Sequence, residues 1–183
     1  MSGIRFATAQ ALFEAYPELL RKIGADPSDQ FPMDFLKTLA SEGRVEDAVT
    51  FCAYLLPRRE AVWWACGCEK ALLRGMAQDR AAGRLAAEAW VCEPDDEHRQ
   101  AALHVGTKGD GNDASTWLAL AAGWAGGFLL SGPHRKIPMP QYMTARAART
   151  AVLISALKVS RDERPARLKA CIADGMRLVG TGM

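Results

Sequence analysis

The sequence predicts an all-α protein, folded as an irregular bundle of about seven or eight helices or as stacked antiparallel helix pairs. Apolar residues recur at the three-to-four-residue spacing of helices along most of the chain, and no stretch shows the sustained alternation of a strand. Glycine and proline separate the periodic segments. No repeat of fixed length is visible, which favours the bundle. At 183 residues, the chain 1–183 is expected to form a single helical domain.

Residues 1–30 are expected to form a peripheral N-terminal segment. Thr8 is a suitable N-cap for a short helix, and Pro17 begins a further turn. Residues 31–42 and 45–56 then carry apolar residues at helical spacing, which predicts two longer helices.

The helix expected at the centre of the bundle begins at Pro57 and runs to about Ala82. Proline suits a first turn, and Glu60 lies there near the positive end of the helix dipole. Trp63 and Trp64 point about 100° apart, so both are expected to be buried against two adjoining surfaces. A helix with two such surfaces belongs in the interior.

The second half of the chain predicts five further helices and one connector. Acidic residues after Pro94 mark a helix start, and the glycines of residues 106–112 mark a loop. Three prolines make residues 131–141 a rigid Pro-rich connector. The helices are expected at residues 85–91, 94–105, 113–129, 142–159 and 162–179.

Composition favours a cytoplasmic globular protein. Hydrophobic residues make up 49% and charged residues 24% of the chain, and the longest apolar stretch is too short for a membrane span.

The five cysteines are odd in number and occupy apolar helical patterns, which predicts reduced, buried thiols. The formal charge is +2, with basic residues concentrated after residue 134. Such a basic end permits docking to an acidic surface, but solvated helix faces are the favoured explanation.

No catalytic, metal or cofactor site is predicted. Cys66 and Cys68 lie two apart on a helix and point about 200° away from each other, so they cannot share a metal ion. His98 and His104 do not share a helix face either. No glycine-rich phosphate motif or nucleophile elbow occurs.

Five residues are the candidate binding residues: Arg58, Arg59, Glu60, Trp90 and Arg99. Tryptophan and arginine dominate binding hot spots, and paired arginines hold carboxylates bidentately. The competing interpretation is structural, with Arg58 and Arg59 bridging to helix ends or to the acidic residues 95–97. This structural role is favoured, because catalysis needs a histidine, cysteine or serine partner nearby.

Three stretches carry a resemblance: Leu56–Ala65 (LPRREAVWWA), Ala89–Arg99, and Thr116–Ala121 running on to Gly126–Gly127. Over roughly residues 30–160 the chain resembles a family of small bacterial helical proteins classed as a domain of unknown function. The resemblance implies an association with type VI secretion gene clusters and assigns no catalytic residue. A serine expected near Ala125 is absent here.

The function predicted first is a non-enzymatic cytoplasmic adaptor or accessory chaperone for a protein partner, such as a secretion component or effector. The missing catalytic constellation and the aromatic-rich helices support it. The alternative is an enzyme of unfamiliar type with a pocket between the tryptophan-bearing helices. Nucleic-acid binding is disfavoured, because the basic residues near the C-terminus are spread around two helices.

Overall fold

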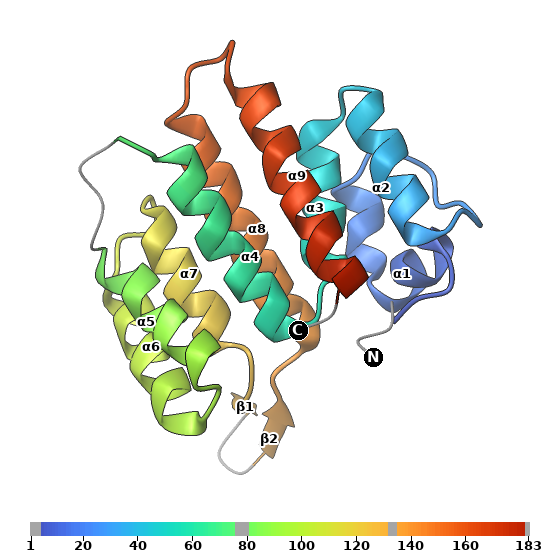
Figure 1. The fold of residues 1–183 in the computed structure, drawn as a ribbon. Helices are drawn as coiled ribbons and strands as arrows, with labels where there is room; N and C mark the ends of the chain where they lie inside the picture. The colour runs from blue at the N-terminus through green and yellow to red at the C-terminus, as the bar shows by residue number, and fades with distance from the viewer. Residues whose placement is uncertain (1–4, 76–80, 132–134, 182–183) are drawn as a thin grey trace.

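The computed structural model describes residues 5–75, 81–131 and 135–181. These residues form nine α-helices, a short 3-10 helix and one antiparallel hairpin, which confirms the predicted all-α class with slightly more helices than expected (Figure 1). The elements are α1 Ala9–Ala15, η1 Pro17–Arg21, α2 Pro32–Ser41, α3 Val45–Leu55, α4 Arg58–Leu72, α5 Ala82–Cys92, α6 Asp96–Lys108, α7 Ala114–Gly123, β1 Phe128–Ser131, β2 Arg135–Pro138, α8 Gln141–Leu157 and α9 Arg164–Thr181.

The helices form three neighbouring groups (Figure 1). Helices α5, α6 and α7 pack together on one side, and α7 also packs on α8. Helices α3, α4, α8 and α9 form the middle, where α4 packs on both α8 and α9. Helices α1 and α2 lie at the other side, next to α3. The hydrophobic core runs continuously through all three groups.

Helix α4 occupies the central position predicted for it, in contact with α5, α7, α8 and α9. Its first turn carries Glu60, as expected, but it ends at Leu72 and not near Ala82. Trp64 is buried and donates a hydrogen bond from Nε1 to the Cys171 carbonyl at 2.8 Å. Trp63 was expected to be buried too, and this was wrong: 44% of it is exposed. No segment of the described chain therefore covers the side of α4 that carries Trp63.

The N-terminal segment lies at the edge of the bundle but contributes to the core. The Thr8 side chain caps α1 as predicted, accepting from the Ala11 amide. Phe13 of α1 contacts Phe35 of α2 edge-to-face and also packs against Phe51 of α3. These aromatic contacts join α1 and α2 to the middle group.

Glycines bring α6 and α7 close together. Helix α6 continues to Lys108, so Gly106 lies in the helix and not in the predicted loop. A Cβ at Gly106 would lie 2.8 Å from the Leu120 side chain, and one at Gly123 would lie 2.7 Å from Leu103 Cα. Glycine at these two positions therefore allows α6 and α7 to approach each other closely.

The chain between α7 and α8 differs from the prediction. Helix α7 ends at Gly123, so Phe128 belongs to a strand and not to the expected helix ending at residue 129. Strand β2 takes four residues of the segment predicted as a connector and pairs with β1 in the register Phe128–Pro138 to Ser131–Arg135. Proline is tolerated here because both strands of a two-stranded sheet are edge strands. Residues 132–134 lie outside the described residues.

The cysteines were predicted to be reduced and buried. All five thiols are free, and all except Cys92 are buried; the expectation of burial was wrong for Cys92. Among the described residues, no helix has the length and apolar character required to cross a membrane.

Candidate functional site

An open groove of about 460 Å³ lies along the exposed side of α4, next to α5. It is lined by Arg59, Trp63, Cys66, Gly67, Lys70, Glu88, Val91 and Cys92. The Arg59 Nε donates to the Val91 carbonyl, whereas Lys70 contacts Glu88 nearer the start of α5. The two helices therefore run antiparallel along the groove.

Helical spacing explains why several α4 residues line the same side of the groove. Arg59, Trp63, Gly67 and Lys70 lie within about 80° of one another around the helix, at 100° per residue. All four are exposed, while Val62 and Trp64 beside them are buried. The wall is thus one continuous stripe that no part of the described chain covers.

Gly67 leaves the middle of this stripe empty. A Cβ placed on it would meet no atom within 4 Å. Glycine inside a helix costs about 1 kcal/mol relative to alanine, and here no close packing contact explains it. The absent side chain instead widens the groove where it passes Trp63.

A charge network joins α4 to α5 at one end of the groove. Glu69 and Arg84 form a buried ion pair at 2.6 Å, and Lys70 pairs with Glu88 at 2.5 Å. A buried ion pair holds its two partners in a fixed geometry, because losing either one would leave a charge unpaired. The network therefore fixes the spacing of the groove walls at this end.

Two of the sequence-predicted binding residues, Arg58 and Arg99, hold the chain that leaves α7. Arg58 donates to the carbonyls of Ala125, at 2.9 Å, and Met139, at 2.6 Å. Arg99 donates to the Gly123 carbonyl at 3.0 Å and pairs with Asp96 at 2.6 Å. Two guanidinium groups from different helices thus fix the segment between α7 and β1. These contacts account for both arginines structurally.

The other three predicted residues lie in different surroundings. Arg59 lines the groove and binds the Val91 carbonyl at 2.8 Å, near the end of α5. Trp90 is only 6% exposed and packs in the core. Glu60 is half-buried and makes no hydrogen bond or ion pair with a described residue. Of the five, only Arg59 lies in the groove, and the structure does not gather them into one site.

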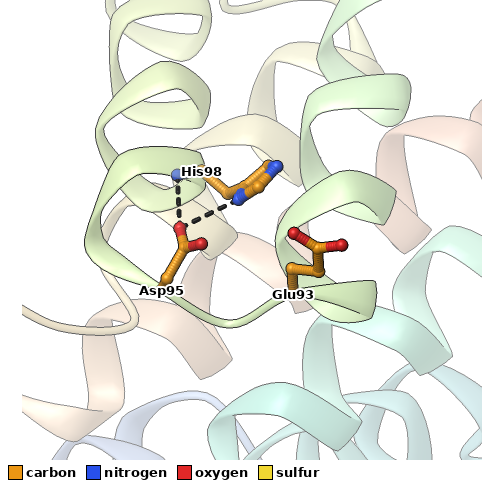
Figure 2. A group of neighbouring side chains, drawn as sticks. All are labelled: Glu93, Asp95 and His98. Carbon is orange, nitrogen blue, oxygen red and sulfur yellow. Dashed lines mark hydrogen bonds and ion pairs between the residues drawn. The ribbon is translucent and has the colours of Figure 1, made fainter.

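Glu93, Asp95 and His98 form a small polar group between α5 and α6 (Figure 2). Asp95 is the N-cap of α6: its Oδ1 accepts from the His98 amide at 2.8 Å and lies 2.9 Å from His98 Nδ1. The hydrogen bond to Asp95 raises the pKa of His98, and the hydrogen bond from the His98 amide lowers the pKa of Asp95. Helix capping explains the group without a metal ion.

The groove residues were not predicted as a set, although the sequence contains a signal for them. Charged Arg59 and Lys70 flank Trp63 on the same helix face, a pattern that indicates exposure. The α5 side of the groove could not be predicted in this way, because it depends on how α5 packs antiparallel to α4. Leu85 lies seven residues before Cys92, on the same side of α5, and is 48% exposed, which extends the apolar surface.

The groove has few groups suited to catalysis. Its lining includes Arg59 but not Arg58, Glu60 or His98, so these polar side chains do not converge on the groove. Burial raises the pKa of the Cys66 thiol, which keeps it protonated and a poor nucleophile.

The fold and groove define an all-α protein with an open, largely apolar groove along its central helix. Residues 35–179 match a family model described as a family of unknown function, DUF6931, and the chain belongs to this family. No curated protein and no solved structure matched the chain.

Proposed function

We propose that the protein is a non-enzymatic adaptor or accessory chaperone that holds an amphipathic helix of a partner protein in the α4–α5 groove. The observation that carries the proposal is Trp63, a large aromatic side chain that is 44% exposed beside the open space at Gly67. Tryptophan is one of the residues enriched in binding hot spots, which cluster near the centre of an interface.

The dimensions of the groove suit a helix. Arg59 and Lys70 mark its ends on α4 and are eleven residues apart, which corresponds to about 16 Å at 1.5 Å per residue. Three turns of a partner helix cover this length, and apolar residues at i, i+4 and i+7 would contact Trp63, Gly67 and the α5 wall. The absent side chain at Gly67 permits a close approach of the partner backbone.

Charge at the two ends gives the partner helix a direction. Arg59 has no ion pair with a described residue, whereas Glu88 already neutralises Lys70 at the other end. An acidic residue on the partner is therefore expected near Arg59. We infer further, from the family resemblance, that the partner is a component or effector of a bacterial secretion system and that the complex is cytoplasmic.

The test replaces Cys92, an exposed residue of α5 that lines the groove, with a photo-crosslinking amino acid in the tagged full-length protein, expressed in its native cell. A crosslinked peptide that is amphipathic, helical in pattern and acidic at one end supports the proposal. The same peptide, synthesised, should bind the purified protein. Trp63→Ala and Gly67→Leu should each weaken this binding at least tenfold, because a central hot spot contributes 2 kcal/mol or more.

Phe31→Ala is the matched control. Phe31 is 47% exposed, similar to Trp63, and does not line the groove. If all three variants bind the peptide equally well, or if crosslinks form only to extended or basic segments, the groove is not a helix-docking site.

The alternative function, an enzyme with a small-molecule substrate, rests on the groove volume of about 460 Å³, which lies within the range of ligand pockets. A thermal-shift screen of metabolites separates the two functions. A ligand that stabilises the native protein but not Trp63→Ala, and that the protein converts to a product, would replace the adaptor proposal.

A further inference from the structure

A second pocket, away from the α4–α5 groove, gathers positive charge at the junction of η1, α3 and α8. It has a volume of about 480 Å³ and is lined by Glu18, Arg21, Lys22, Tyr54, Tyr142 and Arg146. Arg21 and Lys22 come from the end of η1, and Arg146 lies one helical turn after Tyr142 on α8. Segments more than a hundred residues apart in sequence therefore meet at this pocket.

The three cations of the pocket form no ion pair with a described residue, and Glu18 is the acidic residue of the lining. The side chains of Arg21, Lys22 and Arg146 make no hydrogen bond or ion pair within bonding distance of a described residue. Burial and the nearby charges of Arg149 and Arg146 lower the pKa of Lys22, which reflects how closely these cations approach one another. Arg149 is held by its Nε, which donates to the Thr50 hydroxyl at 2.7 Å.

The Tyr54 hydroxyl and the Glu18 carboxylate are neighbours in this pocket. Tyr54 is only 1% exposed, and burial together with the adjacent Glu18 carboxylate raises its pKa. Neither the hydroxyl nor Oε1 of Glu18 makes a hydrogen bond of normal distance and angle with a described residue. A better-placed acceptor would therefore improve the hydrogen bonding of the buried hydroxyl.

We propose that this pocket binds a small molecule bearing a phosphate monoester. Three cations against one carboxylate leave the lining with a net charge of +2. A phosphate monoester carries a charge of about −2 at neutral pH and offers three acceptor oxygens. The two arginines and the lysine neutralise the phosphate, and the Tyr54 hydroxyl donates to one of its oxygens. Glu18 accepts from a hydroxyl or amine donor on the rest of the ligand.

The experiment titrates the full-length protein with phenyl phosphate and with glycerol 2-phosphate by calorimetry at low salt. Saturable binding is expected, stronger for glycerol 2-phosphate, because its hydroxyls can donate to Glu18. Arg146→Ala should weaken it roughly tenfold or more, since a charge-assisted hydrogen bond is lost. Arg161→Ala, which removes an exposed arginine outside the pocket, should leave the affinity unchanged.

Tyr54→Phe provides a test that does not depend on folding defects. Because the hydroxyl makes no hydrogen bond of normal geometry in the unliganded protein, its removal should change the stability little, yet should weaken phosphate-ester binding. Three outcomes would overturn the proposal. The first is the absence of saturable binding, and the second is an equal loss of affinity in Arg146→Ala and Arg161→Ala. The third is binding of a succinate dianion or a single-stranded oligonucleotide in preference to both esters.

Discussion

Replacing Gly67 with alanine should stabilise the protein, which is unusual for a change on a central helix. Gly67 lies in the interior of α4, where a new Cβ meets no atom within 4 Å. Alanine in a helix interior is favoured over glycine by about 0.8–1 kcal/mol. For a chain of 183 residues, this corresponds to a rise in Tm of about 2–4 °C.

Gly175 provides the matched control, because it also lies in a helix interior, that of α9. There a new Cβ would lie 2.3 Å from Cys52 Sγ and 3.0 Å from Trp64 Nε1. Both neighbours are buried, and the Trp64 ring is fixed by its hydrogen bond to Cys171. Overpacking of this kind costs about 1–3 kcal/mol, so Gly175→Ala should be destabilising.

Urea unfolding followed by far-UV circular dichroism measures both free energies of unfolding. The two glycine variants should shift the transition midpoint in opposite directions. If Gly67→Ala lowers the free energy of unfolding as much as Gly175→Ala does, the space at Gly67 is not open and the groove is not a free surface. A second readout is the groove peptide, whose affinity should fall in Gly67→Ala despite the higher stability.

Three further predictions concern the two tryptophans, an arginine and the helix cap. Trp64→Ala should lower the free energy of unfolding in urea by about 3–5 kcal/mol, because Trp64 is buried. Trp63→Ala should lower it far less, because Trp63 is exposed, and equal losses would contradict this assignment. Arg58→Ala should lower the free energy of unfolding by about 1.5–3 kcal/mol, because two carbonyls lose a charged donor. An unchanged midpoint of urea unfolding would mean that water replaces the guanidinium group at these carbonyls. Asp95→Asn should return the raised pKa of His98 toward its ordinary value of 6.5 in an NMR titration. In the native protein this pair stabilises the fold below the ordinary pKa of histidine, and the effect is lost as the pH rises through the raised pKa. A His98 titration that is the same in Asp95→Asn would refute the pairing.

The predictions from sequence succeeded where a cause is local. The Thr8 cap of α1, the acidic first turn of α6 after Pro94, and the central position of the helix after Pro57 all follow from neighbouring residues. Capping and apolar periodicity act within one or two turns, so a single sequence contains the information they need.

Errors arose where a distant segment decides the outcome. Gly106 was assigned to a loop but lies in α6, because Leu120 of α7 packs against it and glycine allows that close approach. Phe128 continued a helical pattern but pairs with Pro138 in a hairpin whose base is held by Arg58. Periodicity cannot reveal such pairings, since it reports on neighbours within one segment and not on the segment that packs against it.

The same division applies to the sites. The sequence alone predicted an all-α fold and a central helix after Pro57. The exposed stripe of α4 from Arg59 to Lys70 became visible only in the folded structure, where α5 lies beside it without covering it, so that Trp63 faces an open groove. The tertiary structure alone brought Lys22 and Arg146 together at Tyr54. Burial depends on what packs across from a residue, and helix packing in space sets that partner.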